Sequence, residues 1–372
     1  MIPLPTFSPQ QDTALKAVAE WLKEKRVRGG APPIFRLFGY AGTGKTTLAR
    51  HFAQGIDGKV LYAAFTGKAA LVMRRKGCQG ATTIHSLIYK PIENNTEQPS
   101  FELWDDAPAS KAKLIIIDEC SMVDADLARD LMSFGAPLLV LGDPAQLPPV
   151  QGGGFFTEAK PDAMLTEVHR QAQNDPIVRL SMDIRAGRRL EIGQYGETQV
   201  VARQNLDPQR VLDADQVLVG RNVTRKAYNG RMRERRGFEG PLPLVGDKLV
   251  CLRNNRRKGL LNGGLWTIKE RPKPRRDIIN MQVKSDDFIS DRLLKVKVRT
   301  ECFTGAIEEI AWDQRKAFDE FDFGYVLTVH KSQGSQWDDV VLFDESDVFR
   351  ENRGRWLYTG VTRAAKRLTV VL

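Results

Sequence analysis

The sequence predicts an α/β protein in which short, buried strands run parallel to one another. Two fully apolar runs, residues 114–117 and 138–141, are followed by polar residues, as expected where a buried parallel strand reaches the edge of its sheet. A strand-type run at residues 34–38 passes through a glycine-rich loop into residues that favour a helix. The same α/β pattern begins again at residues 217–220 and returns near the end of the chain.

The glycine-rich loop reads GYAGTGKT at residues 39–46 and agrees with the phosphate-binding pattern GxxxxGK[ST] at every fixed position. Glycines let successive backbone N–H groups point inward at phosphate oxygens, and the following helix adds the positive end of its dipole. We therefore predict that a nucleoside triphosphate with Mg²⁺ is bound by Gly42, Thr43, Gly44, Lys45, Thr46 and Thr47. Lys45 would reach the β- and γ-phosphates, and the Thr46 hydroxyl would bind Mg²⁺. A glycine-rich turn before an ordinary helix is the alternative, and the correct flanks on both sides argue against it.

The first helix is predicted to begin just after Ser8, because Pro9 suits the first helical position and apolar residues then recur at helical spacing. Ser8 and Gln11 have the spacing of a capping box, in which each side chain bonds the backbone N–H of the other. Gln11 could instead read an adenine base just upstream of the phosphate-binding loop. The sequence leaves both roles of Gln11 open.

The composition excludes several classes of protein. The 372 residues are 42% apolar, which is ample for globular cores in two or three domains. No apolar run approaches the ~20 residues that a membrane span needs, and the first residues do not resemble a signal peptide. The four cysteines lie far apart without a CxxC pair, which indicates reduced thiols and neither a disulfide framework nor a zinc site.

The charge balance favours a polyanionic partner. Lys and Arg number 56 against 46 Asp and Glu, which gives a net charge of +10. That excess alone fits simple solubility as well as it fits nucleic-acid binding. The basic residues cluster, however, at residues 74–76, 231–236, 253–258 and 269–276. Clustering favours a binding surface for nucleic acid.

Two stretches interrupt the α/β pattern. Residues 87–89 and 101–104 are short β-type runs around an Asn-rich turn, and they predict a β-hairpin insertion at about 87–110. A surface loop is the alternative interpretation. From about residue 240 to 322, strand-like pieces alternate with Gly, Pro and charged turns, which predicts a small all-β insertion.

Polar residues after the predicted strands supply the rest of a triphosphatase site. Asp118 would bind Mg²⁺, directly or through water, and Glu119 would polarise the attacking water, because phosphoryl transfer depends on a positioned nucleophile. Gln146 could sense the γ-phosphate or could be an ordinary polar loop residue. Arg170 and Arg363 are candidates for stabilising transition-state charge, as an arginine finger does.

In their order along the chain, these stretches resemble the motifs of superfamily 1 helicases, and most closely those of the RecD/Dda-like branch, which moves 5′ to 3′. The resemblance covers nearly the whole chain and implies an ATP hydrolase that acts as a DNA helicase. Besides the phosphate-binding loop it rests on six stretches: TGKAA at 66–70, TIH at 83–85, DECSM at 118–122, GDPAQLPP at 142–149, TVHKSQGS at 328–335 and YTGVTRA at 358–364.

The resemblance implies two RecA-like P-loop domains, residues 1–175 and 176–372, with ATP in the cleft between them. Arg363 would reach the nucleotide from the second domain, and Arg170, at the junction of the domains, would also face the γ-phosphate. Opening and closing of the cleft would then move the protein along single-stranded DNA.

The resemblance implies a role for each of the two insertions. The hairpin would be the pin that separates the strands, and the 240–322 insertion would be a small β-barrel that clamps the single strand. The residues implied in DNA binding are Thr66, Lys68, His85, Phe101, Trp104, His330, Lys331 and Gln333. Of these, Phe101 and Trp104 are the large apolar side chains of the pin, although either could instead anchor the hairpin.

Two other classes of protein are alternatives. A metabolic P-loop enzyme such as a small-molecule kinase would hydrolyse ATP regardless of DNA. A DNA-binding protein that uses ATP only as a switch would need neither Glu119 nor the two arginines. We favour a monomeric helicase acting on single-stranded DNA and duplex forks in the cytoplasm of a bacterium or a phage-infected cell. The biological pathway and RNA as a substrate stay open.

Overall fold

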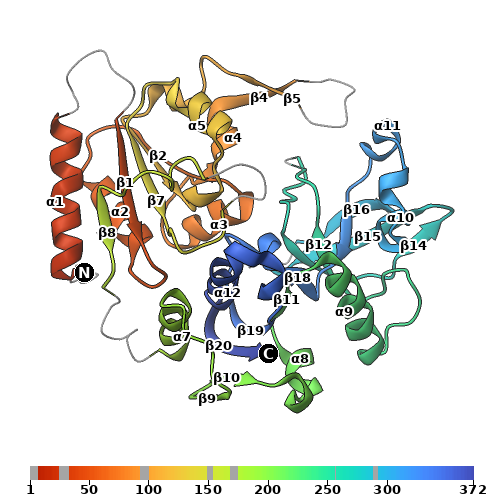
Figure 1. Ribbon diagram of the computed structural model, residues 1–372. Helices are drawn as coiled ribbons and strands as arrows, with labels where there is room; N and C mark the ends of the chain where they lie inside the picture. The colour runs from red at the N-terminus through yellow and green to blue at the C-terminus, as the bar shows by residue number, and fades with distance from the viewer. Residues whose placement is uncertain are drawn as a thin grey trace. The chain divides into compact units, whose positions relative to one another are not determined.

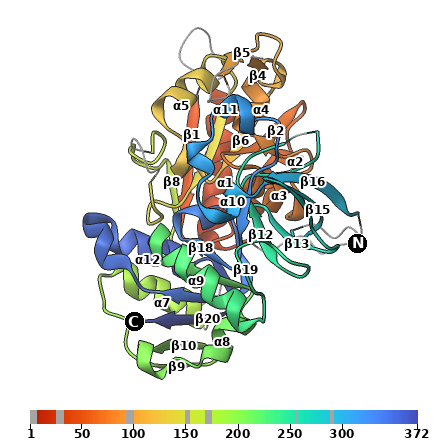
Figure 2. The same ribbon diagram turned by 90° about the vertical axis from the view of Figure 1, so that its right-hand side faces the viewer.

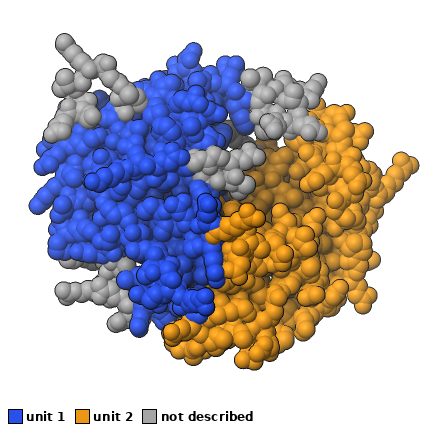
Figure 3. Space-filling view, viewed as in Figure 1, with its two compact units in different colours: residues 1–91, 101–190, 351–362 blue, residues 92–100, 191–350, 363–372 orange. Residues whose placement is uncertain are grey.

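The computed structural model describes residues 7–24, 33–92, 100–148, 154–167, 175–255, 257–287 and 292–372 (Figure 1). Its contacts divide the chain into two compact units, which Figure 3 colours separately. Unit 1 comprises residues 1–91, 101–190 and 351–362, and unit 2 comprises residues 92–100, 191–350 and 363–372. Each unit contains a largely parallel sheet, so the predicted α/β class is confirmed.

Unit 1 is built on six strands that all run parallel, in the order β3-β2-β6-β7-β1-β8. The strands are β1 (Ile34–Gly39), β2 (Val60–Ala64), β3 (Thr82–Thr83), β6 (Leu114–Asp118), β7 (Leu138–Gly142) and β8 (Ala163–Leu165). The helices are α1 (Pro9–Glu24), α2 (Lys45–Gln54), α3 (Gly67–Arg75), α4 (Ile84–Ile88), α5 (Ala125–Met132), α7 (Pro176–Arg185) and α12 (Arg353–Val361).

Alternate residues of β6 enter two different cores, because successive side chains of a strand point to opposite faces. Leu114 and Ile116 pack with residues of α1 and α2, whereas Ile115 and Ile117 pack with residues of α4 and α5. All four side chains are fully buried. A strand covered on both faces must be apolar throughout, which explains why the run at 114–117 is continuous and does not alternate.

Unit 2 has a second six-stranded sheet, in the order β18-β11-β19-β20-β10-β9, in which only β9 runs antiparallel to its neighbour. Helix α9 packs on β11 and β18 of this sheet, and Figure 2 shows it beside β18. The strands are β9 (Gly193–Tyr195), β10 (Thr198–Val201), β11 (Gln216–Val219), β18 (Val326–Thr328), β19 (Trp337–Phe343) and β20 (Ala364–Val371). The helices of unit 2 are α8 (Pro208–Asp213), α9 (Asn222–Arg235), α10 (Glu301–Thr304) and α11 (Trp312–Arg315).

A third, antiparallel sheet lies within unit 2, in the stretch for which the sequence predicts all-β structure. Its order is β14-β15-β13-β12-β17, and β16 pairs with β15. A bridge between Val298 of β16 and Asp319, just before β17, connects the two sides of this sheet. The strands are β12 (Lys248–Cys251), β13 (Leu265–Ile268), β14 (Lys273–Arg275), β15 (Ile278–Ser285), β16 (Leu294–Arg299) and β17 (Phe321–Phe323).

A two-stranded sheet joins β4 (Tyr89–Ile92) to β5 (Ser100–Leu103). The prediction of a β-type run at 87–89 is wrong for Leu87 and Ile88, which belong to helix α4. The Thr83 side chain caps this helix by accepting a bond from the Ser86 N–H, and Ile84, Leu87 and Ile88 are buried at helical spacing. The residues between the two strands, 93–99, lie outside the described part of the chain.

The division into units differs from the predicted boundary between residues 175 and 176. Helix α7 belongs to unit 1, and so does α12, although the strands before and after α12 belong to unit 2. The physical reason is that α7 and α12 pack against each other.

Within the described residues, no helix is both long enough and apolar enough to cross a membrane. All four cysteines are described, and each is a buried free thiol.

Candidate nucleotide site and nucleic-acid contacts

The phosphate-binding loop connects β1 to α2 and depends on its glycines for its shape. Gly42 and Gly44 have positive φ angles of 79° and 80°, a region that side chains rarely adopt. A Cβ atom on Gly39 would lie 2.6 Å from the Thr43 Oγ1 and 2.8 Å from the Leu165 Cβ. Within the described residues, the N–H groups of Gly42 and Gly44 have no hydrogen-bond partner, so they can donate to the oxygens of a bound anion.

Two side chains of the predicted phosphate and metal site, Lys45 and Thr46, form hydrogen bonds at the end of the loop. Lys45 donates from its Nζ to the carbonyl oxygens of Gly39, at 2.5 Å, and Tyr40, at 3.0 Å, so its ammonium group lies over the loop. Thr46 donates from Oγ1 to the Asp118 Oδ2 at 2.8 Å. These oxygens are the hard donors that Mg²⁺ prefers, and Mg²⁺ commonly completes its shell with phosphate and water. No group of three or more His, Cys, Asp or Glu side chains capable of holding a metal occurs in the described part of the chain.

Glu119 has a strained backbone. Its φ of 55° and ψ of 44° fall in the left-handed region, which costs a non-glycine residue about 1–3 kcal/mol. Its N–H donates to the Asp118 Oδ1 at 2.9 Å, so Asp118 bonds the neighbouring backbone through one oxygen and Thr46 through the other. Strain of this kind is concentrated at functional sites, where it aims a side chain that a relaxed backbone would point elsewhere.

The loop after β7 adds two buried polar residues at the same edge of the sheet, since β6, β7 and β1 are parallel neighbours. Asp143 accepts from the Ala145 N–H at 3.0 Å. Gln146 is 8% exposed, and its Oε1 has no hydrogen-bond partner within the described residues. A buried amide oxygen without a hydrogen bond lowers the stability of the fold, so a purely structural role does not explain Gln146. This favours the prediction that Gln146 takes part in the nucleotide site.

Gln11 forms the capping box that its spacing predicts. Its N–H donates to the Ser8 Oγ at 3.3 Å, and its Oε1 accepts from the Ser8 N–H at 3.0 Å. Its Nε2 also donates to the Thr43 carbonyl oxygen at 3.0 Å, which ties the start of α1 to the phosphate-binding loop. The adenine-reading role of Gln11 stays a prediction.

The two candidate arginines differ in what the structure describes. Arg170 lies outside the described residues. Arg363 belongs to unit 2, is 5% exposed, and donates from its guanidinium to the Ser335 carbonyl oxygen at 3.2 Å. This bond connects two of the stretches on which the resemblance rests.

The DNA-contact candidates of unit 1 include an aromatic cluster. The ring of His85 lies 6.1 Å from that of Phe65, 5.6 Å from that of Tyr89 and 5.8 Å from that of Phe101. Phe101 and Trp104 are both 40% exposed. Thr66 accepts from the Ala69 N–H and so caps α3, and Lys68 is buried.

The candidates of unit 2 lie just past the end of β18. Burial lowers the pKa of His330, whose ring packs 5.2 Å from that of Phe349. Burial, and then the positive charge of Arg225, lower the pKa of Lys331. Gln333 is buried in the same segment. The DNA-binding roles of His330, Lys331 and Gln333 stay predictions.

Sequence reasoning missed Tyr358, which lies in the YTGVTRA stretch and donates from its hydroxyl to the Asp143 Oδ2 at 2.7 Å. In that stretch, the sequence predicts a site role for Arg363 alone. It also missed Arg185, whose guanidinium lies 3.0 Å from the ring centre of Tyr40 in the phosphate-binding loop. No motif contains Arg185, so only the packing of α7 reveals it.

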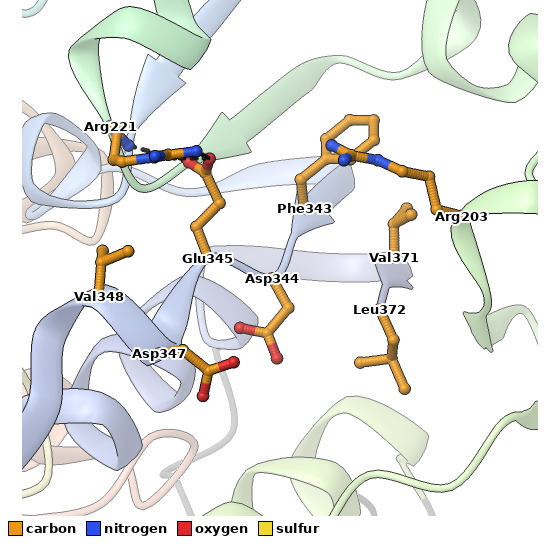
Figure 4. A pocket seen from close by; sticks show the side chains of 9 residues that line it. All are labelled: Arg203, Arg221, Phe343, Asp344, Glu345, Asp347, Val348, Val371 and Leu372. Carbon is orange, nitrogen blue, oxygen red and sulfur yellow. Dashed lines mark hydrogen bonds and ion pairs between the residues drawn. The ribbon is translucent and has the colours of Figure 1, made fainter.

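A cavity of about 270 Å³ in unit 2 contains none of the predicted site residues (Figure 4). Glu345, which lines it, accepts from the N–H groups of Gly220 and Arg221, from the Arg221 guanidinium and from the Thr224 hydroxyl. These bonds join the end of β11 to the end of β19, so Glu345 has a structural role.

The fold and the site define an α/β P-loop protein in which a threonine of the loop is hydrogen-bonded to an aspartate, with a strained glutamate beside it. The chain belongs to the AAA domain family, whose profile matches residues 8–205. Residues 323–371 match a second family, the UvrD-like helicase C-terminal domain.

Three relatives are named as helicases. The chain is 28% identical to the ATP-dependent RecD2 DNA helicase of Deinococcus radiodurans over 89% of its own length and 46% of the relative's. It is 30% identical to the ATP-dependent DNA helicase dda of Enterobacteria phage T4 over 48% of its length and 42% of that relative's. It is 24% identical to the ATP-dependent DNA helicase Pif1 of Bdellovibrio bacteriovorus over 82% of its length and 76% of the relative's. The chain thus spans less than half the length of the first two.

Solved structures share the fold. The Pif1 helicase of Candida albicans has a TM-score of 0.58 at 18% identity, over 99% of this chain and 94% of that one. The Bacteroides Pif1 helicase in complex with ADP-AlF3 and ssDNA has a TM-score of 0.58 at 17% identity, over 99% and 92% of the two chains.

Proposed function

We propose that this chain is an ATP-dependent DNA helicase that moves 5′ to 3′ along single-stranded DNA. The observation that carries the proposal is the Thr46–Asp118 pair with Glu119 beside it, placed next to the phosphate-binding loop. A protein that used ATP only as a switch would not need a strained glutamate at that position. The relatives named as ATP-dependent DNA helicases support the helicase assignment over a small-molecule kinase.

ATP and Mg²⁺ are the proposed cofactors. Mg²⁺ would be held by Thr46 and Asp118, and when bound it would neutralise charge on the phosphates. Lys45 would turn from the loop carbonyls to the β- and γ-phosphates. Glu119 would orient and deprotonate the attacking water, while Gln146 would sense the γ-phosphate. Gln11 would read the adenine.

The domain organisation that we propose is two RecA-like domains, residues 1–175 and 176–372, with the nucleotide between them. Arg363 and Arg170 would stabilise the charge of the transition state. Closing on ATP and opening after hydrolysis would advance the protein along the strand. A monomeric state and a cytoplasmic location remain predictions.

The third sheet and the two-stranded sheet also receive roles in this proposal. The third sheet would form a small β-barrel over the single strand, and the bridge between Val298 and Asp319 supports its closure. The β4–β5 hairpin would be the pin at the fork. Its base is attached to helix α5 of unit 1, because the Tyr89 hydroxyl donates to Asp130 at 2.5 Å. Its two strands are joined by the ion pair of Lys90 with Glu102 at 3.0 Å.

The proposed function is tested on duplexes that carry a 5′ tail, a 3′ tail or no tail. The 5′-tailed DNA duplex is expected to open preferentially when ATP and Mg²⁺ are present, and single-stranded DNA is expected to stimulate ATP hydrolysis strongly. The same duplexes with RNA tails measure the preference between the two nucleic acids. Preferential opening of the 3′-tailed duplex would contradict the direction, and ATP hydrolysis indifferent to DNA would favour a metabolic enzyme.

We infer that Trp104 acts at the fork more directly than Phe101. The Phe101 ring packs against His85 and Tyr89, so it anchors the hairpin, whereas Trp104 is equally exposed and has no ring partner within the described residues. A base stacked on an aromatic ring gains about 1–3 kcal/mol. Trp104→Ala is therefore expected to slow unwinding by roughly 5- to 150-fold and to leave DNA-stimulated ATP hydrolysis largely intact.

Leu103→Ala is the matched control, because Leu103 is also 40% exposed and lies next to Trp104 but cannot stack on a base in the same way. Unwinding of the 5′-tailed duplex and ATP hydrolysis are measured for both variants. An equal loss of both activities in Trp104→Ala would make the residue a structural anchor of the hairpin.

A further inference from the structure

Tyr358 connects two parts of the candidate nucleotide site through one hydroxyl group. Its side chain is fully buried. The hydroxyl donates to the Asp143 Oδ2 at 2.7 Å and accepts from the Ala41 N–H at 2.9 Å. Ala41 lies inside the phosphate-binding loop, and Asp143 begins the loop that carries Gln146. All four residues belong to unit 1.

The direction of these two bonds is set by chemistry. A carboxylate can only accept, so the single proton of the Tyr358 hydroxyl is directed to Asp143, and a lone pair remains for the Ala41 N–H. Burial, and then the negative charge of Asp143, raise the pKa of Tyr358 far above neutral pH, so the hydroxyl retains this proton. The result is a continuous chain of two bonds from backbone amide to hydroxyl to carboxylate. Each bond polarises the next.

The neighbouring residue attaches the same helix to the other end of the Gln146 loop. Thr359 accepts on its Oγ1 from the Leu147 N–H at 2.9 Å and donates to the Arg355 carbonyl oxygen at 2.7 Å. Helix α12 therefore bonds Asp143 on one side of Gln146 and Leu147 on the other. In the sequence, Gln146 lies between these two attachment points, and its Oε1 has no hydrogen-bond partner within the described residues.

We propose that Tyr358 is a positioning residue that holds the phosphate-binding loop and the Gln146 loop in a fixed relation to each other, so that both act on the same bound nucleotide. This role of Tyr358 depends on the ATP hydrolysis that we propose for the chain. Tyr358 is not expected to touch the nucleotide, because both of its bonds are made to protein groups. Its effect is on the rate of hydrolysis, which depends on geometry more steeply than binding does.

Tyr358→Phe removes the hydroxyl and keeps the buried ring. We expect kcat for DNA-stimulated ATP hydrolysis to fall by roughly 10- to 100-fold, because a misplacement of about 1 Å at a catalytic group has an effect of that size. KM for ATP is expected to change little, since the N–H groups of Gly42 and Gly44 and the Lys45 side chain stay in place. Tyr62→Phe is the matched control, because the Tyr62 hydroxyl belongs to the same unit and has no hydrogen-bond partner within the described residues.

A second readout needs neither nucleotide nor turnover. In protein labelled with ¹⁵N-alanine, amide hydrogen exchange at Ala41 is expected to speed up in Tyr358→Phe, because that N–H loses its acceptor. Exchange at Ala64 in β2 and Ala128 in α5, both fully buried, is expected to stay at the wild-type rate. The exchange rate at Ala41 tests the hydrogen-bond chain by itself. If the helicase assignment is wrong, the wild-type protein will show no ATP hydrolysis, whatever the exchange rate at Ala41.

Unchanged kcat or unchanged exchange at Ala41 would overturn the proposal. Faster exchange at all three alanines would overturn it as well, because it would assign Tyr358 a general structural role. Should Tyr358→Phe fail to fold, Asp143→Asn weakens the same chain while retaining an oxygen acceptor, and it is expected to give the same two changes in smaller measure.

Discussion

Lys45→Ala is expected to abolish ATP hydrolysis, with a loss of at least 10²–10³-fold, about what removal of one preorganised donor to a developing charge costs. The Lys45 ammonium lies over the loop, bonded to the carbonyls of Gly39 and Tyr40, and it is the positive charge that we propose for the phosphates. Glu119→Gln is expected to slow turnover by roughly 10²–10⁴-fold, because an amide cannot accept the proton of the attacking water. This variant should still bind ATP.

Two measurements separate a loss of catalysis from a loss of nucleotide binding. They are steady-state ATP hydrolysis with saturating single-stranded DNA and binding of a fluorescent ADP. Lys16→Ala is the control for lost positive charge, since Lys16 is exposed on α1 of the same unit. Turnover near the wild-type rate in Glu119→Gln would show that the water-positioning role belongs to another residue.

Arg363→Ala is expected to lower kcat for ATP hydrolysis by roughly 10³–10⁵-fold, the range found for arginine fingers. Binding of single-stranded DNA should be retained, because the proposed contacts of His330, Lys331 and Gln333 are not altered. Arg363 is buried and bonded to the Ser335 carbonyl oxygen, so some loss of thermal stability is also expected.

Arg355→Ala is the matched control, because Arg355 is an exposed arginine of the helix that precedes Arg363. Hydrolysis, DNA binding by fluorescence anisotropy and the melting temperature are measured on both variants. A parallel loss of hydrolysis and DNA binding in Arg363→Ala would indicate that the residue supports the fold of unit 2 and does not act on the nucleotide.

Local patterns were sufficient for the central strands of the α/β sheet of unit 1. The apolar runs at 34–38, 114–117 and 138–141 correspond to β1, β6 and β7 within one residue at the carboxyl end. A strand buried on both faces must be continuously apolar, and a phosphate-binding loop must have glycines at fixed positions, so both leave a strong trace in a single sequence.

The sequence prediction is wrong where a short apolar segment is compatible with both a strand and a helix. Leu87 and Ile88 are apolar and adjacent to a predicted hairpin, and they form the last turn of α4 because Thr83 caps a helix that buries Ile84 on the same face. The packing of α7 on α12 within unit 1 is also beyond local patterns, because the two helices lie far apart in the chain. Neither outcome is encoded within a window of a few residues.

The phosphate-binding loop, the pair proposed for Mg²⁺ and the glutamate proposed to activate water are all predictable from residue types and spacing, because each belongs to a motif that is continuous in the chain. The Tyr358 bond to Ala41 is not, since its partners are 317 residues apart. The same holds for the Tyr358–Asp143 bond and for the Arg185 guanidinium over the Tyr40 ring. Such pairs form only when packed helices bring distant side chains to a loop, and a hydrogen bond or a cation–π contact is specified by distance and direction, which a linear pattern does not contain.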